Sequence, residues 1–217
     1  MRLAVFDLDH TLLAGDSDDL WGEFLIELGR VDAETQRRAN RRFAIKYKAG
    51  TLDIAEFYAF ALQSLAGNSL ADLHAWRERY LREKIEPIVA ARTFALLEHH
   101  RAQGDTLLIT TATNSFITTP IAELLGVPHL IATEPEFAGG GYTGRVAGLP
   151  NFQDGKVTRL RSWLAAQPHR YEHLTCYSDS RNDIPLLEMA QVAIAVDPDD
   201  TLRAHALQRG WPVISLR

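Results

Sequence analysis

The chain has 217 residues, of which 46% are hydrophobic and 24% charged, and its formal net charge is −5. That length suits one domain with an elaboration or two small domains, and the apolar fraction suffices for a large core. The acidic balance argues against a nucleic-acid-binding protein, whose surface is usually basic. A single cysteine, Cys176, excludes an intrachain disulfide framework and is consistent with a reducing compartment.

The N-terminus carries no secretory signal pattern, since its apolar stretch meets Asp7 after only four residues. No apolar run approaches the roughly 20 residues that cross a bilayer. We therefore expect a soluble, cytoplasmic protein without a membrane span and without a nucleic-acid partner. The sequence sets no expectation for the oligomeric state.

Six short apolar runs indicate buried strands, several of them nearly continuous in Val, Ile and Leu, as in parallel sheets covered on both faces. In chain order these runs lie at 2–6, 106–110, 129–133, 174–178, 192–196 and 212–215. From residue 92 onward helical segments alternate with them, at 92–103, 115–126, 156–167, 184–190 and 200–209. The alternation predicts an α/β fold with a Rossmann-like parallel sheet and helices on both faces.

Residues 17–86 interrupt this rhythm, because they contain apolar residues at helical spacing and no strand pattern. The segment 54–66 is apolar nearly all round, as expected of a helix packed on several sides. We expect an all-helical cap of three or four helices at 17–86, inserted into an α/β core formed by 1–16 and 87–217. The Gly-rich stretch 136–145 predicts a hairpin that projects from the core.

Polar and charged residues follow several of the expected strands, at the ends where open parallel sheets bind ligands. The residues concerned are Asp7 and Asp9 after 2–6, Thr111 after 106–110, Lys156 near a helix start, and Asp179, Asn182 and Asp183 after 174–178. They come from four separate segments. The predicted topology would bring at least three of these segments to one edge of the sheet.

Three or so carboxylates suit a hard cation such as Mg²⁺, and no Cys/His cluster indicates zinc. Together with Mg²⁺, Lys156 and Thr111 would neutralise and position a phosphoryl group. One carboxylate beside the metal could attack phosphorus to form an aspartyl-phosphate, and a second could protonate the leaving alkoxide and later activate water. Neighbouring carboxylates would raise the pKa of that second acid, as its role requires.

These segments resemble the four motifs of the haloacid dehalogenase (HAD) superfamily. The stretch "DLDHT" (7–11) matches its DxDxT motif, and "LLITT", which ends at Thr111, resembles the second motif. Lys156 resembles the third motif, and "SDSRND" (178–183) the fourth. A helical cap between the first two motifs resembles the phosphoserine-phosphatase-like branch. The resemblance covers essentially the whole chain and implies a Mg²⁺-dependent phosphoric monoester hydrolase acting on a small phosphorylated metabolite.

The resemblance also implies a role for each matching residue. Asp7 would be the nucleophile and a metal ligand, and Asp9 would be the general acid/base and bind Mg²⁺ through its backbone carbonyl. The other implied roles are phosphate binding for Thr111, Lys156 and Asn182, metal binding for Asp179, and support of the site for Asp183.

Two departures from the family pattern concern the geometry of the loops. His10 stands where many members have Gly, and Ser178 and Ser180 replace two glycines of the fourth motif. Neither departure removes a charge or a ligand, so the expected activity is unchanged. The role of His10 itself stays open between a loop residue and a site residue.

Asp16, nine residues after the expected nucleophile, is the candidate specificity residue. In the phosphoserine phosphatases that the sequence resembles, a Glu at the corresponding place contacts the substrate amine and a cap Arg contacts its carboxylate. Here the shorter Asp16 stands at that place, and the segment 54–66 contains no Arg. Because a buried substrate carboxylate would lack a cationic partner, we expect a phosphorylated amino alcohol, such as histidinol phosphate, rather than phosphoserine. The alternative is that Asp16 only caps the first helix of the cap.

Other functions are weighed against this expectation. A phosphoserine phosphatase proper is the nearest alternative. A phosphoacceptor receiver also places acids, Ser/Thr and Lys around Mg²⁺, but its acceptor Asp lies mid-chain and it carries no such helical insert. A phosphate-binding protein without turnover is a third alternative, although every motif residue is present. A dehalogenase would not need Asp9, and an ion-pump-like domain would have Thr in its place.

Several residues also have simpler interpretations. Asp183 could be only the N-cap of the helix that follows it. His99 and His100 are expected to face solvent on a charged helix, and Cys176 to be inert core. The basic segment 37–48, with six cations and no acid, is expected to be a solvated helix face, with steering of phosphate esters as the alternative.

Overall fold

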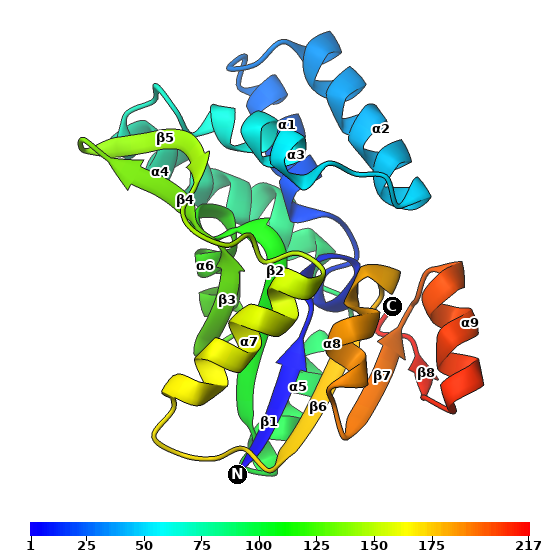
Figure 1. Cartoon of the computed structure of the whole chain (residues 1–217). Helices are drawn as coiled ribbons and strands as arrows, with labels where there is room; N and C mark the ends of the chain where they lie inside the picture. Colours follow the sequence, from blue (N-terminus) through cyan, green and yellow to red (C-terminus); the bar gives the residue numbers. More distant parts are fainter.

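In the computed structural model, which describes all 217 residues, a six-stranded parallel sheet forms the centre of the molecule (Figure 1). The strands lie in the order β3-β2-β1-β6-β7-β8. Their bounds are β1 Arg2–Phe6, β2 Thr106–Asn114, β3 His129–Thr133, β6 His173–Ser178, β7 Val192–Val196 and β8 Val213–Ile214. Each strand begins within one residue of its predicted start, and the sheet confirms the predicted α/β class.

The sheet is covered on both faces because the side chains of its strands alternate. Ala4 and Phe6 of β1 belong to the buried cluster on one face, and Leu3 and Val5 belong to the cluster on the other. The helices of the first face are α5 Thr93–Ala102 and α6 Ser115–Leu124, and those of the second are α7 Asp154–Ala166, α8 Ile184–Glu188 and α9 Asp200–Arg209. Burial of both faces explains the near-continuous Val, Ile and Leu runs of the sequence.

Residues 17–86, which we call the helical insert, contain helices and no strand, and they lie beyond one end of the sheet in Figure 1. The α-helices are α1 Ser17–Glu27, α2 Ala33–Ala49, α3 Ile54–Ala61 and α4 Leu70–Tyr80. A short helical turn lies between α3 and α4, at η2 Leu62–Ser64. Two more follow α4, at η3 Leu81–Ile85 and η4 Glu86–Ile88. Each α-helix begins after an Asp or Ser whose side chain accepts backbone N–H groups of the first turn, which explains where the four helices start.

The two ends of the helical insert meet beside the sheet. Leu13 and Val89 form an isolated antiparallel bridge, so the chain leaves and rejoins the core at one place. Farther along the insert, the hydroxyl of Tyr58 donates to the carbonyl of Ala112 at 2.7 Å, which anchors α3 over the end of β2. The insert is therefore tied to the core both at its base and over the end of β2.

The predicted hairpin is present as β4 Pro135–Ala138 and β5 Gly141–Val146, which pair antiparallel. Gly139 and Gly140 form its turn with φ angles of 61° and 85°, values that residues with a side chain rarely adopt. The hairpin thus needs its glycines for the turn, as the sequence indicated.

The prediction that His100 faces solvent is wrong. His100 is buried, with 3% of its surface exposed, whereas His99 is exposed as expected. The two ring nitrogens of His100 lie 2.7 Å from the carboxylate of Asp105 and 2.8 Å from the hydroxyl of Tyr177. Because both nitrogens have a partner inside the protein, burying this imidazole leaves no polar atom unsatisfied.

Two of the simpler expectations agree with the structure. The basic segment 37–48 lies on α2, where Arg37, Arg42 and Lys46 pair with glutamates of neighbouring helices and most other side chains are exposed. Cys176 is buried within β6.

None of the helices is both long enough and apolar enough to traverse a lipid bilayer.

Candidate active site

Asp7 follows β1 directly, at the centre of the sheet. β1 lies between β2 and β6, so Asp7 stands where the strand order reverses, the position at which open α/β sheets bind ligands. The side chain is buried, and both of its oxygens are engaged. Oδ1 lies 2.7 Å from Nζ of Lys156, and Oδ2 accepts the hydroxyl of Thr11 at 3.2 Å. The carboxylate is therefore held in one orientation before any ligand arrives.

Lys156, in the first turn of α7, connects Asp7 to Asp183. Its Nζ also lies 2.7 Å from Oδ2 of Asp183, which accepts the hydroxyl of Ser178 at 2.8 Å. Burial alone would lower the pKa of the Lys156 ammonium, but the charges of Asp183 and Asp7 outweigh burial and raise this pKa above its ordinary value. Lys156 is therefore a permanent cation between two carboxylates. The prediction that Asp183 could be only a helix cap is not confirmed, since its side chain makes no capping hydrogen bond to α8 and contacts Lys156 and Ser178 instead.

Asp179 follows β6, the strand next to β1, and its carboxylate lies close to that of Asp7. The hydroxyl of Thr11 is 3.1 Å from Oδ1 of Asp179 and 3.2 Å from Oδ2 of Asp7. Burial raises the pKa of the Asp179 carboxyl well above its usual range, and the charges of Asp7 and Asp183 raise it further. No Lys, Arg or His pairs with Asp179, so negative charge at this point is not fully compensated by the protein.

The carboxylate of Asp9 is held by β2 and by the start of α1. Its Oδ1 accepts the N–H of Ser17 at 2.7 Å, and its Oδ2 accepts the hydroxyl of Thr113 at 2.8 Å and that of Thr111 at 3.4 Å. Burial raises the pKa of the Asp9 carboxyl and the charge of Asp16 adds to this effect, although the hydrogen bonds act in the opposite direction. A raised pKa suits an acid that must deliver a proton near neutral pH.

Thr111 lies within β2 and not after it, because the strand continues to Asn114 instead of ending at residue 110 as predicted. Thr113, which the sequence reasoning missed, contacts the same carboxylate. Residues two apart in a strand point to the same face, so a hydroxyl two residues after Thr111 was the available signal. The run Thr111–Asn114 is polar and carries no apolar strand pattern, which explains why the strand was predicted too short.

Asn182 lies in the loop after β6 with its side chain buried. Its Oδ1 accepts Nε2 of Gln153 at 2.9 Å, whereas its Nδ2 has no hydrogen-bond partner. Gln153 was not among the predicted site residues, although it lies three residues before Lys156, directly before α7. Its φ of 48° lies in the left-handed region, which is uncommon for a residue with a side chain. A buried amide donor without a partner is suited to an anion.

His10 belongs to the turn that follows the first motif. Its φ is 58°, a left-handed conformation that glycine adopts at lower cost and that accounts for the glycine common at this position in the family pattern. Its N–H donates to the carbonyl of Gly15 at 3.0 Å, and its own carbonyl accepts Nη2 of Arg217 at 3.0 Å. The residue is exposed, and these contacts are those of a loop residue.

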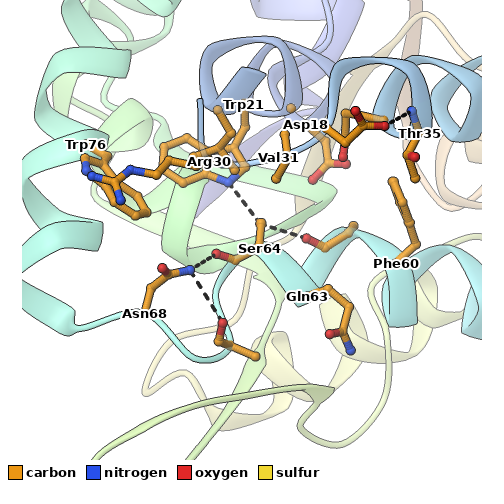
Figure 2. Close-up of a pocket in the computed structure, with 16 residues that line it drawn as sticks. Asp18, Trp21, Arg30, Val31, Thr35, Phe60, Gln63, Ser64, Asn68 and Trp76 are labelled. Carbon is orange, nitrogen blue, oxygen red and sulfur yellow. Dashed lines mark hydrogen bonds between the residues drawn. The ribbon is translucent and has the colours of Figure 1, made fainter. Parts of the chain in front are cut away.

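Asp16 caps α1, which is the alternative that the sequence left open. Its Oδ1 accepts the N–H groups of Asp18 and Asp19, each at 2.9 Å. Asp18, two residues later, lines a cavity of about 430 Å³ within the helical insert (Figure 2). The sequence shows three acids in four positions, and only the structure distinguishes the one that faces the cavity.

The oxygen donors at the sheet edge fit a hard cation. No group of three or more His, Cys, Asp or Glu side chains converges as ligands. Asp7 and Asp179 provide two adjacent carboxylates, and the third expected ligand, the carbonyl of Asp9, is a backbone atom. Carboxylate and carbonyl oxygens, with water completing the shell, are the ligands that Mg²⁺ prefers.

Known phosphatases are similar to this chain over almost its whole length. The family model of haloacid dehalogenase-like hydrolases matches residues 4–188. The histidinol-phosphatase of Neisseria meningitidis serogroup C is 39% identical over 220 residues, which cover 100% of this chain and 99% of that protein. Phosphoserine phosphatase SerB1 of Mycobacterium tuberculosis is 31% identical over 99% of this chain and 70% of that protein.

Solved structures share the fold. A protein of unknown function from Bordetella pertussis Tohama I matches with a TM-score of 0.93 and 44% identity, covering 100% of this chain and 99% of that one. A substrate-bound phosphoserine phosphatase matches with a TM-score of 0.69 and 17% identity, covering 100% of this chain and 93% of that one. At the lower identity the similarity concerns the fold alone.

Proposed function

The chain belongs to the haloacid dehalogenase-like hydrolase family and is a phosphatase, and from this premise we propose that it hydrolyses a small phosphate monoester through an aspartyl-phosphate on Asp7. One observation carries the proposal. The buried carboxylate of Asp7 lies at the reversal point of the sheet and is held by Lys156 and Thr11 at hydrogen-bond distance. We also propose that the helical insert, 17–86, acts as a cap over a core of 1–16 and 87–217.

Asp7 and Asp9 would divide the chemistry between them. An oxygen of Asp7 attacks phosphorus, the bond between phosphorus and the alkoxide breaks, and Asp9 transfers its proton to the departing oxygen. Asp9, now ionised, removes a proton from water, and the resulting hydroxide attacks phosphorus. Phosphate leaves and the carboxylate of Asp7 is restored. The raised pKa of Asp9 supports its first role, and its hydrogen bonds to Ser17 and Thr113 hold it in place.

Three further groups would bind the phosphoryl oxygens. Lys156 keeps its charge, and Thr111 presents a hydroxyl beside Asp9. Asn182 contributes an amide nitrogen that has no partner inside the protein. Charged and neutral donors of this kind stabilise the negative charge of a transferring phosphoryl group when they are fixed in advance.

Asp7, Asp179 and the carbonyl of Asp9 would hold Mg²⁺, with Asp183 supporting the site through Lys156. The bound cation would supply neutralisation of the phosphoryl charge and polarisation of its oxygens. The closely spaced carboxylates of Asp7 and Asp179, both on Thr11, support this assignment, since no side-chain cation balances Asp179.

For the substrate we propose a phosphorylated amino alcohol, with histidinol phosphate as the first candidate. The relative of 39% identity that aligns from end to end bears the name of that activity. The cavity in the helical insert contains acidic and aromatic residues, and Arg30 is the one cation among those that line it. Phosphoserine phosphatase activity is the alternative, supported by the 31% relative, and it would require Arg30 or another cation to bind the substrate carboxylate.

The proposal is tested by phosphate release from histidinol phosphate, phosphoserine and p-nitrophenyl phosphate, with Mg²⁺ and with EDTA. We expect turnover that depends on Mg²⁺, a higher kcat/KM for histidinol phosphate than for phosphoserine, and a phosphorylated protein in acid-quenched samples of wild type but not of Asp7→Asn. Full activity in EDTA would refute the metal assignment. A labelled phosphoryl group on Asp7→Asn would refute the nucleophile, and a preference for phosphoserine would refute the substrate.

A further inference from the structure

The cavity in the helical insert is a preformed space of the size that small ligands occupy. It measures about 430 Å³ and is bounded by α1, α2, α3 and the segment that leads into α4 (Figure 2). Pockets that hold small molecules typically measure roughly 300–1,000 Å³ and combine apolar walls with a few polar groups. The residues of this cavity have that composition, and none of them takes part in the phosphoryl chemistry proposed above.

Three aromatic side chains, Trp21, Phe60 and Trp76, contribute to the wall, and each is held by a neighbouring side chain. Trp21, which is 2% exposed, donates its indole N–H to the hydroxyl of Ser64 at 3.1 Å and stacks on Phe24. Phe60 packs against Phe43 with ring centroids 5.5 Å apart. Phe60 is the most exposed of the three rings, and an aromatic face attracts a planar or cationic group because it carries partial negative charge.

The charged side chains that line the cavity are of both signs. Two are the acids Asp18 and Asp32, and the third is Arg30, which lies on the Trp76 side with its guanidinium 4.8 Å from the ring centroid of Trp76 (Figure 2). A cationic ligand entering this space is attracted toward Asp18 and repelled by Arg30. The arrangement therefore imposes an orientation on a ligand that carries an ammonium group.

Asp18 differs from the other two acids at the start of α1. Asp16 is committed to the helix cap, where its carboxylate accepts two backbone N–H groups, and Asp19 is exposed. The carboxylate of Asp18 accepts no hydrogen bond, although the residue is mostly buried. Burial raises the pKa of the Asp18 carboxyl well above its usual range, and the charges of Asp16, Asp19 and Asp9 raise it further. A ligand cation would relieve both effects.

Asp18 is also close to the proposed general acid. The residue before it, Ser17, donates its backbone N–H to Oδ1 of Asp9 at 2.7 Å. The charge of Asp9 also acts on the carboxyl of Asp18, so these two acids lie close enough to interact across the start of α1. A substrate whose phosphate lies at Asp7 could place an amine, a few bonds beyond its ester oxygen, near Asp18.

We propose that Asp18, and not Asp16, binds the ammonium group of the substrate, and that the aromatic cavity beyond Asp18 receives the ring or chain attached to that amine. The inference rests on the proposed phosphatase function and adds to it a specificity residue and a subsite. It selects phosphate esters with an amine near the ester carbon and a planar apolar group farther away.

The test compares the matched substitutions Asp18→Asn and Asp16→Asn. Both remove one negative charge with little change in shape, and Asn preserves the cap at position 16 because it is as good an N-cap as Asp. For Asp18→Asn we expect kcat/KM for histidinol phosphate to fall about 10- to 100-fold, mainly through KM, as for the loss of one charge-assisted hydrogen bond. The activity of Asp18→Asn on the analogue of histidinol phosphate that lacks the amine, and on p-nitrophenyl phosphate, should stay within about threefold of wild type. Asp16→Asn should keep the amine selectivity of wild type within about threefold.

A second readout does not depend on turnover. Calorimetric titration should show that histidinol binds wild type more tightly than the deamino alcohol, and that Asp18→Asn loses this difference while Asp16→Asn keeps it. Loss of amine selectivity in Asp16→Asn but not in Asp18→Asn would overturn the inference. Equal use of both esters by wild type would also overturn it, while continued hydrolysis of p-nitrophenyl phosphate would leave the proposed function intact. Hydrolysis of no ester with Mg²⁺ would overturn both.

Discussion

The sheet-edge site and the cavity of the helical insert treat buried charge in opposite ways. At the sheet edge, Asp7 and Asp183 share the ammonium of Lys156 at 2.7 Å, and each also accepts a hydroxyl, from Thr11 and Ser178 respectively. In the cavity, the carboxylate of Asp18 has no hydrogen-bonding partner within the protein. Asp7, Lys156 and Asp183 are paired with one another before a ligand binds, whereas Asp18 has no cation beside it and would gain one from the ligand.

This difference separates a region built for chemistry from a region built for recognition. Groups that act in a transition state gain most from being fixed beforehand, since no free energy is then used to arrange them during the reaction. A recognition group gains from a desolvated charge that only the correct ligand satisfies, because an incorrect ligand leaves it unpaired. Substitutions at the sheet edge should therefore change the rate for every ester, and substitutions in the cavity should change the choice among esters.

The largest expected effect belongs to Asp7→Asn. The amide is a poor nucleophile. The change also removes the negative charge that pairs with Lys156 and that would bind the metal ion. We expect kcat to fall by about 10⁴-fold or more on every ester, as when other enzymes lose their nucleophile. Circular dichroism should show a folded protein. Retention of most of the wild-type rate, or a loss confined to amine-bearing esters, would erase the distinction between the two regions.

Asp9→Asn should have the next largest effect, and one that depends on the leaving group. A general acid contributes a factor of about 10² to 10⁴ where the leaving oxygen needs a proton, as in alkyl phosphates. Aryl esters such as p-nitrophenyl phosphate leave without one, so their cleavage step should be much less affected. The check is the ratio of burst rates for alkyl and aryl esters, and equal losses on both would show that Asp9 does not act as a proton donor.

Lys156→Gln should destabilise the fold as well as the reaction. The substitution leaves the buried carboxylates of Asp7 and Asp183 close together without their cation, and breaking a buried ion pair typically costs 3–5 kcal/mol, so we expect a loss of about 3 kcal/mol. The double substitution with Asp183→Asn should recover about 1 kcal/mol or more, because one of the two unpaired charges is then absent. Urea denaturation of the two single variants and the double variant measures this coupling, and strict additivity would mean that Lys156 does not join the two acids.

The fold and most of the candidate site follow from local patterns in the sequence. Apolar runs located all six strands, and acids that follow β1 and β6 were expected together because neighbouring parallel strands end at one edge. The error at His100 had a visible signal. Thr93, Leu97 and His100 recur at helical spacing and form the buried face of α5, which the charged composition of the helix obscured.

Other features depended on contacts between distant segments. Thr113 reaches Asp9 only because β2 continues beyond the apolar run, where its register with β3 shifts between Thr110 and Asn114, and no local apolar pattern indicates that continuation. The choice between Asp16 and Asp18 depends on which carboxylate the first turn of α1 uses as its cap. Asp, Ser and Asn are about equally good caps, so composition alone cannot make that choice.

The smallest expected effects concern the contacts that join the helical insert to the core, and a matched pair of substitutions compares them. Tyr58 is 3% exposed, and its hydroxyl contacts the carbonyl of Ala112 at 2.7 Å and the hydroxyl of Thr133 at 2.8 Å. Tyr47 is 37% exposed, and its hydroxyl lies 2.7 Å from that of Ser180, beside Asp179. Tyr58→Phe removes a hydrogen bond to the half-buried carbonyl of Ala112 and another to the buried hydroxyl of Thr133, so we expect a loss of about 1–2 kcal/mol in urea denaturation. Water can replace the hydroxyl in Tyr47→Phe, so the free energy of unfolding of this variant should fall by less than about 0.5 kcal/mol.

A larger loss for Tyr47→Phe than for Tyr58→Phe would show that the helical insert is held mainly through the loop of the fourth motif, which carries Ser180 and Asp179. The insert and the sheet-edge site would then be less independent than the comparison of the two regions suggests.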